Sequence, residues 1–202
     1  MTLIVFEGLD ASGKETQSKL LKHWLDRKKI SSIVIHSPNT KTPVGQAFEK
    51  YLYEEFKMER DAVFLICACD VIINKPIIEK ANKEDKVVVA DRYITSTIAY
   101  QGANGFPFEK SLKIVETMEF PKADIIIYID ISPETSMKRK QREKEKLDKH
   151  EKNKEFLTKV KDFYMKEIRE SVLGEWFVVD GEKSKEEVHN QIVKIIENKL
   201  RI

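Results

Sequence analysis

The sequence predicts an α/β fold built on a five-stranded parallel sheet with helices on both faces. Five short runs rich in β-branched residues alternate along the 202-residue chain with longer amphipathic runs. The short runs are continuously apolar, as expected for strands that are buried on both faces. No linker rich in Pro, Gly or Ser interrupts the pattern, so one domain is expected to span residues 1–202.

Each expected strand is a run of apolar residues: LIVF at 3–6, SIVI at 32–35, VVVA at 87–90, IIIYI at 125–129 and WFVV at 176–179. Helical patterns lie between them, at residues 16–29, 44–55, 62–82, 95–102, 108–118, 134–146, 153–172 and 186–200. In the first of these, Leu20, Leu21, Trp24 and Leu25 share one face. Sheets of this kind bind ligands beyond the carboxyl ends of their strands, so the loops after the strands are the expected place for a site.

Composition limits the classes of function. Hydrophobic residues make up 41% of the chain, enough for a sizeable core. The 36 Lys and Arg residues nearly balance the 34 Asp and Glu residues, which disfavours a general nucleic-acid binder. No apolar run approaches the length of a membrane-spanning helix, which is about 20 residues. The apolar start is too short for a signal-peptide core, and the two cysteines form no disulfide framework. The sequence therefore predicts a cytoplasmic protein with no nucleic-acid partner and no membrane partner.

A phosphate-binding loop is expected after the first strand. Gly8, Gly13 and Lys14 fit the G-x-x-x-x-G-K spacing, with a strand before them and an amphipathic helix after them. The glycines let backbone N–H groups close around phosphate oxygens, and the start of the helix adds its positive dipole end. Lys14 is expected to reach the β- and γ-phosphates. The nucleotide-binding residues predicted by this motif are Gly8, Leu9, Asp10, Ala11, Ser12, Gly13, Lys14, Glu15 and Thr16.

The position after the lysine departs from the motif, which has Ser or Thr there to bind Mg²⁺. This chain has Glu15, and the hydroxyl comes one residue later, at Thr16, which is expected to bond the α-phosphate. A carboxylate holds a hard cation directly or through water, so Glu15 faces the metal in one interpretation. In the other, Glu15 turns to solvent as an acidic residue of the first helical turn, which the helix dipole also favours. Both interpretations remain open at this stage.

A second charged motif follows the third strand. Asp91 is placed to hold Mg²⁺ through water, and Arg92 beside it is suited to fork onto phosphate oxygens. Residues 82–85 match the N-K-x-D pattern with which GTPases read guanine, but they lie in a helix-to-strand loop and no D-x-x-G element occupies a matching strand end. The sequence thus favours a phosphotransferase over a GTPase switch.

Along its whole length the sequence resembles the thymidylate kinase family, whose members phosphorylate dTMP with ATP. Residues 91–102 are similar to the family's D-R-Y/H-x-x-S-x-x-A-Y-Q-G stretch. Further similar segments are 6–10, 43–45, 147–151 and 179–188. The resemblance implies a P-loop nucleoside monophosphate kinase with a helical lid at about residues 138–152, ATP and Mg²⁺ as cofactors, dTMP as substrate, and a homodimer. A kinase for another deoxynucleoside monophosphate and a P-loop nucleotide-binding regulator without turnover remain the alternatives.

The resemblance also implies roles for single residues. Asp10 would lie near the sugar and phosphate of the monophosphate, Arg92 would grip that phosphate, and Tyr100 would lie against the deoxyribose. The implied substrate-binding residues are Asp10, Pro38, Phe64, Arg92, Ser96, Thr97, Tyr100 and Gln101. Phe64 is included because Cys67 and Val71 stand where the family has a base-stacking aromatic and an arginine, while Ser37 replaces its Phe before Pro38. These departures predict a weaker preference for dTMP over other monophosphates.

Phosphoryl transfer gathers negative charge on the moving group, so positive charges must close over it. Some family members carry an arginine inside the phosphate loop, and others supply it from the lid. Ala11 occupies the loop position here, so the lid is expected to supply Arg139 and Arg142, which are three residues apart on one helical face. The predicted catalytic residues are Lys14, Asp91, Arg92, Arg139 and Arg142, with Glu15 and Asp91 on the metal side, through water.

Overall fold

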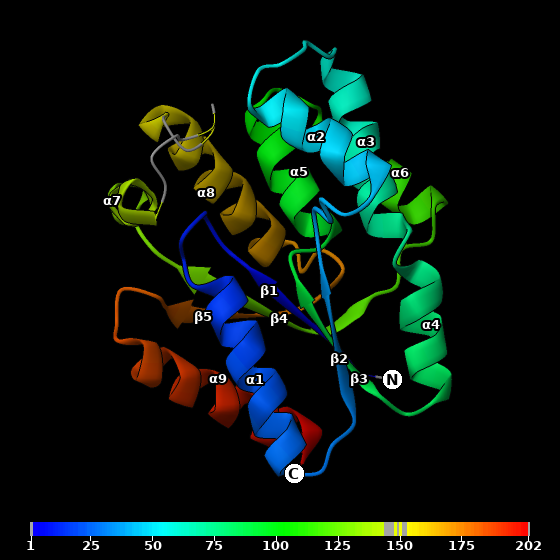
Figure 1. The fold of residues 1–202 in the computed structure, drawn as a ribbon, viewed down its shortest axis with the longest axis vertical. Coiled ribbons are helices and arrows are strands. Elements are labelled where there is room, and N and C mark those ends of the chain that lie inside the picture. Colours follow the sequence, from blue (N-terminus) through cyan, green and yellow to red (C-terminus); the bar gives the residue numbers. More distant parts are fainter. Residues whose placement is uncertain (1, 144–147, 149, 151–152, 202) are drawn as a thin grey trace.

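A five-stranded, all-parallel sheet runs through the centre of the computed structural model, which describes residues 2–143, 148, 150 and 153–201 (Figure 1). The strands are β1 (Thr2–Glu7), β2 (Ser32–His36), β3 (Val87–Asp91), β4 (Ala123–Asp130) and β5 (Gly174–Asp180). They lie in the order β2-β3-β1-β4-β5, and every neighbouring pair is parallel. The predicted fold class and all five predicted strands are confirmed.

Helices cover both faces of the sheet (Figure 1). They are α1 (Lys14–Arg27), α2 (Pro43–Leu52), α3 (Arg60–Ile72), α4 (Lys75–Lys83), α5 (Ile94–Ala103), α6 (Phe108–Thr117), α7 (Pro133–Glu143), α8 (Lys154–Arg169) and α9 (Lys185–Leu200). No helix in these described ranges is long and apolar enough to cross a bilayer.

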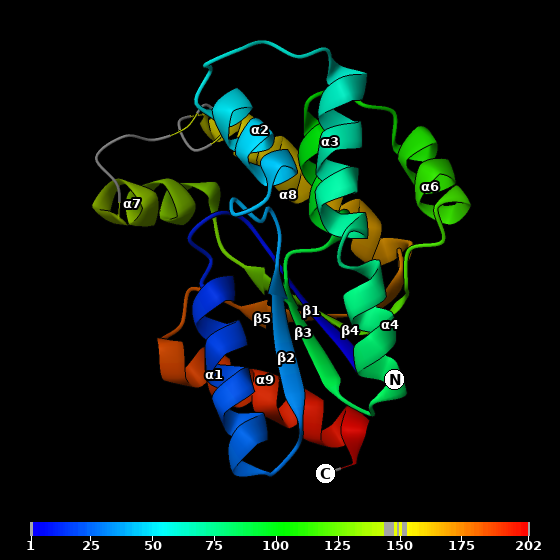
Figure 2. The same cartoon turned by 45° about the vertical axis from the view of Figure 1, so that its right-hand side comes forward.

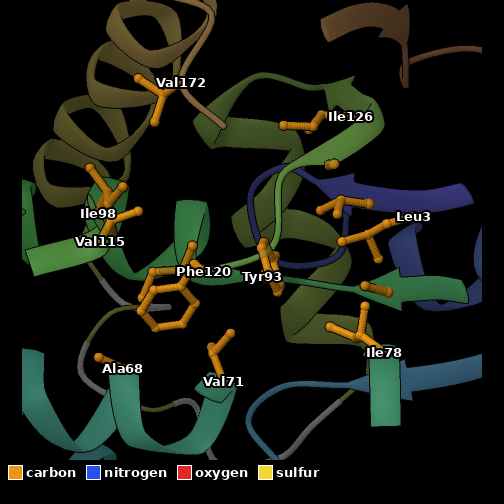
Figure 3. Close-up of a cluster of buried hydrophobic side chains, with 14 of the residues drawn as sticks. Leu3, Ala68, Val71, Ile78, Tyr93, Ile98, Val115, Phe120, Ile126 and Val172 are labelled. Carbon is orange, nitrogen blue, oxygen red and sulfur yellow. The ribbon is translucent and has the colours of Figure 1, made fainter. Parts of the chain in front are cut away.

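Successive residues of β1 alternate between two apolar cores, because neighbouring side chains of a strand point to opposite faces. Ile4 and Phe6 pack with side chains of α1 and α9. Leu3 and Val5 pack on the other face with side chains of α3, α4, α5 and α6, in the cluster drawn in Figure 3. A third cluster joins α5 and α8 over Tyr128 of β4. Burial on both faces explains why the central strands β1, β3 and β4 read as continuous apolar runs. The edge strands β2 and β5 depart from this expectation, because Val34 and Val178 are exposed.

The single helix predicted at 62–82 is wrong, because the structure divides it into α3 and α4. Pro76 lies within the first two positions of α4. A proline lacks the N–H that a helix interior needs, and it disfavours helical geometry in the residue before it. The other predicted helices are confirmed with ends that differ by a few residues. The end of the predicted helix 134–146, and lid residues 144–147, 149, 151 and 152, lie outside the described residues.

The strand order brings two distant loops together at one edge of the sheet. β1 lies between β3 and β4, so the loops that follow β1 and β3 leave the sheet side by side. Phe6 is in register with Asp91, and the backbone N–H of Arg92 donates to the carbonyl oxygen of Phe6 at 3.0 Å. The phosphate-loop motif and the Asp91–Arg92 motif therefore meet beyond the carboxyl ends of the strands, where such sheets bind ligands.

Candidate active site

The loop between β1 and α1 has the backbone that the glycine spacing predicts. Gly8 and Gly13 have φ angles of 147° and 100°, in a region that side chains disfavour. A Cβ on Gly8 would lie 2.6 Å from the carbonyl oxygen of Ile129 and 2.7 Å from Ser12 Oγ. There is therefore no room for a side chain at this position. Gly13 precedes the first turn of α1 without a capping side chain. The N–H groups of that turn are therefore available to an anion.

Lys14 is buried and folds back over the loop. Its Nζ donates to the carbonyl oxygens of Gly8 at 3.0 Å and Leu9 at 2.6 Å, and to Ser12 Oγ at 3.4 Å. Burial, followed by the positive charge of Arg92, lowers the pKa of Lys14 from 10.5 to about 7. In the free protein the protonated form of the amine is therefore less favoured than in water. A bound anion would stabilise the protonated form and raise the pKa.

Arg92 forms the second centre of positive charge. Its Nη2 bonds to Asp10 Oδ1 and to the Tyr100 hydroxyl at 3.3 Å, while Nη1 donates to Ser96 Oγ at 3.0 Å. Tyr100 in turn donates to Asp10 Oδ2 at 3.0 Å. Arg92 has a φ of 67°, an uncommon value for a residue with a side chain. The backbone bond to Phe6 holds it in that conformation.

Asp10 stays ionised between these cations. Burial alone would raise its pKa, but the charges of Arg92, Lys14 and Lys140 outweigh burial and hold that pKa well below its usual range. Asp10 therefore sits as a permanent anion between the phosphate loop and Arg92, in the place where phosphate oxygens would compete for the same cations.

Glu7 is a residue of this site that the sequence analysis did not assign. It is fully buried at the end of β1 and accepts hydrogen bonds from the Tyr93 N–H at 3.0 Å, the Ser96 N–H at 3.1 Å and Thr95 Oγ1 at 2.6 Å. Ser96 Oγ and the Tyr164 hydroxyl donate to its other oxygen at 2.5 and 2.8 Å. Its carboxylate thus serves as the cap that the start of α5 lacks, and it fixes Ser96 behind Arg92. A Glu directly before the first glycine of the motif was the available signal.

The structure separates the two residues predicted on the metal side. Asp91 is buried at the end of β3, and His36 Nδ1 lies 3.1 Å from its Oδ2. Burial raises the pKa of Asp91, but the bond to His36 and the charge of Lys14 outweigh that effect and lower it. The Glu15 side chain is 69% exposed and pairs with Lys19 at 2.5 Å, the geometry of the solvent-facing interpretation. Thr16 is also exposed.

A cavity opens beside Arg92, between the loop after β2 and helices α2, α3 and α5. Its lining residues are Asp10, Ser37, Pro38, Phe48, Leu52, Cys67, Asp70, Val71, Arg92, Tyr93, Ser96, Thr97, Tyr100, Gln101, Asp148 and His150. Among the predicted substrate-binding residues, only Phe64 does not line it. The Phe64 ring is fully buried and stacks on Phe106 with centroids 4.1 Å apart. The structure therefore places Phe64 in the core and not beside the cavity.

Helices α2 and α3 give the cavity an apolar lining. Phe48 and Leu52 of α2 line it together with Cys67 and Val71 of α3. Gln101 adds an amide to the lining, and its Nε2 lies 4.0 Å from Cys67 Sγ. The carboxylate of Asp70 already has a hydrogen-bond partner, because both of its oxygens accept the backbone N–H of Asn39, at 3.1 and 3.2 Å. That bond fixes the loop that carries Ser37 and Pro38.

His150 is a second residue that the sequence analysis did not place at the site. Its ring stacks on Phe156 at 4.4 Å between centroids and lies 5.9 Å from the Tyr100 ring. Its backbone N–H donates to Asp148 Oδ1 at 2.8 Å. These two residues, from the far end of the predicted lid, therefore close one side of the cavity.

The two predicted lid arginines have different surroundings. Arg139 donates to the carbonyl oxygen of Ala11 at 3.3 Å and to that of Gly181 at 3.0 Å. Arg142 is exposed on α7. The structure thus brings Arg139 to the phosphate loop but does not bring Arg142 to it.

Comparison with known proteins agrees with this geometry. A family model described as thymidylate kinase matches residues 6–192. The chain is 36% identical over 197 residues to a probable thymidylate kinase of Methanocaldococcus jannaschii, covering 96% of this chain and 95% of that protein. It is 33% identical over 198 residues to a protein of Saccharolobus solfataricus named probable thymidylate kinase 1, covering 98% of both. It is 31% identical over 195 residues to a thymidylate kinase of Fervidobacterium nodosum, covering 95% of this chain and 96% of that one.

Proposed function

The chain belongs to the thymidylate kinase family, a family of ATP-dependent nucleoside monophosphate kinases, and we propose that it transfers the γ-phosphoryl group of ATP to dTMP, yielding dTDP and ADP. The observation that carries the proposal is the position of Asp10, between Lys14 of the phosphate loop and Arg92, which lines the cavity. Two phosphate-binding cations that converge on one point are what a transfer between two phosphates requires.

In the proposed transfer, different residues of the site bind the phosphate donor, orient the phosphate acceptor and position Arg92. The loop N–H groups and Lys14 hold the triphosphate, and Arg92 orients the phosphate of dTMP so that one of its oxygens faces the γ-phosphorus. A new P–O bond forms to that oxygen as the bond between the γ-phosphorus and the leaving ADP oxygen breaks. Asp10, Ser96 and Tyr100 hold the guanidinium of Arg92 in place before the substrate arrives. This preorganisation is the chief electrostatic contribution of the protein.

The donor set at the end of β3 fits a Mg²⁺ ion. This ion is usually held by one or two carboxylates, several waters and the phosphates of the substrate. Asp91 is a buried, ionised carboxylate beside Lys14 and is the residue we propose to hold it, through water. When bound, Mg²⁺ would neutralise charge on the phosphate oxygens. We do not propose that Glu15 holds it, since that side chain pairs with Lys19.

The substrate proposal is tested by a panel of dTMP, dUMP, dCMP and dGMP with ATP, in which kcat/KM is measured for each. Apolar contacts from Phe48, Leu52 and Val71 distinguish a methyl group by about 1–3 kcal/mol, and Val71 offers the base no hydrogen bond. We therefore expect dTMP to be the best substrate, preferred over dUMP by about 10- to 100-fold. Good activity on a purine monophosphate without activity on dTMP would indicate a different monophosphate kinase. The absence of ADP release with every member would indicate a regulator without turnover.

ATP binding is expected to take up protons at pH 8. Because the pKa of Lys14 is about 7 in the free protein, most Lys14 side chains are neutral at pH 8. Phosphate oxygens favour the charged amine and raise that pKa, so binding draws a proton from solution. Calorimetric titrations in two buffers of different ionisation enthalpy measure this uptake, which should approach one proton per ATP and be absent in Lys14→Met. Equal heats in both buffers for the unsubstituted protein would contradict the assignment.

We also propose the homodimer that the family resemblance implies. Leu65 of α3 and Ile77 of α4 are 57% and 45% exposed, and Ile73 between the two helices is 45% exposed. Helices α3 and α4 follow one another along the outside of the molecule (Figure 2). A second copy packed on these side chains would remove them from water. The cytoplasmic location stays a prediction.

A further inference from the structure

His36 and Asp91 lie side by side at the carboxyl ends of two neighbouring strands. The parallel register of β2 and β3 pairs these two residues, and the N–H of Ser37 donates to the carbonyl oxygen of Asp91 at 3.1 Å just beyond that pair. Because side chains alternate along a strand, Asp91 points to the same face as Val87 and Val89, which pack with side chains of α1. His36, as the register partner of Asp91, belongs to that face as well.

The Asp91 carboxylate depends on His36 for its hydrogen bond. The side chain of Asp91 is only 4% exposed, whereas that of His36 is 56% exposed and reaches in from the edge of the sheet. Their contact joins His36 Nδ1 to Asp91 Oδ2 at 3.1 Å. Among the residues that the structure describes, no other side chain forms a hydrogen bond with this carboxylate. An ionised carboxylate can only accept, so Nδ1 of His36 carries the proton and donates it.

Lys14 attracts the same carboxylate from the opposite neighbouring strand. β3 lies between β2, which carries His36, and β1, which leads into the phosphate loop. The ammonium of Lys14 attracts Asp91 electrostatically, but its hydrogen bonds go to oxygens of the phosphate loop. The contact with His36 therefore fixes Oδ2 of Asp91 on the β2 side and leaves Oδ1 available to accept hydrogen bonds from water molecules at the site.

We propose that His36 is a positioning residue, which holds Oδ2 of Asp91 so that Oδ1 is oriented for the water shell of Mg²⁺ bound with ATP. This inference rests on the proposed function, in which Asp91 holds that ion through water. Residues that hydrogen-bond to a group near a metal orient that group and strengthen metal binding. A carboxylate that is already held in one orientation also loses less conformational freedom when the hydrated ion binds.

The test measures by calorimetry the affinity for an ATP analogue with an imido group between its β- and γ-phosphorus atoms, once in excess Mg²⁺ and once in EDTA. The ratio of the two affinities isolates the contribution of the ion and needs no turnover. His36→Phe keeps a planar ring but removes the donor, and we expect it to lower this ratio by about 10-fold while the affinity in EDTA stays unchanged.

Two further variants show whether the hydrogen bond causes the effect. His36→Asn should restore most of the ratio, because the amide nitrogen of Asn is as many bonds from the Cβ as Nδ1 of His. The matched control is His23→Phe, the same change at an exposed position of α1, which should retain the full ratio. The thermal unfolding midpoint of each variant shows whether the fold is intact.

An unchanged ratio in His36→Phe would overturn the inference. An equal loss of affinity in Mg²⁺ and in EDTA would also overturn it, because His36 would then contact the nucleotide itself. Asp91→Asn should lower the ratio at least as far as His36→Phe does, and adding His36→Phe to it should lower the ratio no further. Additive losses would show that His36 acts independently of Asp91, against the inference.

The proposed function fails in a different measurement, since these titrations involve no monophosphate. The expected ratios in a protein that transfers phosphate to no monophosphate would overturn the kinase proposal and support the role of His36. Equal affinities in Mg²⁺ and in EDTA for the unsubstituted protein, together with transfer to dTMP, would overturn the role of His36 and support the kinase proposal.

Discussion

Replacing Lys14 by methionine is expected to reduce phosphoryl transfer by about 100- to 1,000-fold and to leave the fold intact. The amine is buried among three oxygens of the phosphate loop, where few water molecules compete with a phosphate for its charge. A charge in such a preorganised site stabilises the transition state far more than a charge in water. The measurement is kcat and kcat/KM for both substrates, together with the thermal unfolding midpoint.

The matched control for that variant is Lys19→Met in the same helix. Lys19 is 65% exposed and pairs with Glu15, so the same change of charge occurs outside the site. Exposed pairs of this kind contribute little to stability, and we expect activity near that of the unsubstituted protein. Near-normal turnover in Lys14→Met, or an equal loss in Lys19→Met, would contradict the role of the phosphate loop.

The sheet was predictable from sequence because its strands are apolar on both faces. Several short apolar runs separated by longer amphipathic runs are typical of buried parallel strands connected by helices. The phosphate loop was predictable for a related reason, since Gly8 needs both its φ angle and its lack of a Cβ. The break between α3 and α4 was missed although Pro76 marks it, because the apolar pattern continues through both helices.

Helical periodicity shows which face of α3 is buried but not what covers it. Phe64 and Cys67 both lie on that face, yet Phe64 packs on Phe106 and Cys67 lines the cavity. The partner of Phe64 comes from a loop far along the chain, and no local pattern encodes that contact. Glu7 was missed for the same reason, since its donors are between 86 and 157 residues away.

Arg92→Met is expected to lower kcat/KM for dTMP by about 1,000-fold and to change the KM for ATP much less. The guanidinium bonds to Asp10, Ser96 and Tyr100 at once, and it faces the cavity that we assign to the monophosphate. Arg92→Lys should recover little of this loss, because a single ammonium cannot keep those bonds and also fork onto a phosphate. Steady-state kinetics with each substrate varied in turn separates the two effects.

Arg92→Met also leaves the carboxylate of Asp10 without its main partner, so a loss of activity could reflect a loss of stability. Removing one member of a partly buried ion pair destabilises a fold because the remaining charge is poorly solvated. The double variant Asp10→Asn with Arg92→Met removes both charges and should unfold nearer to the temperature of the unsubstituted protein. Its activity should stay low, since the phosphate of dTMP still lacks its cation. Recovery of activity along with stability would show that Arg92 only balances Asp10, and the assignment of Arg92 to the acceptor phosphate would then be wrong.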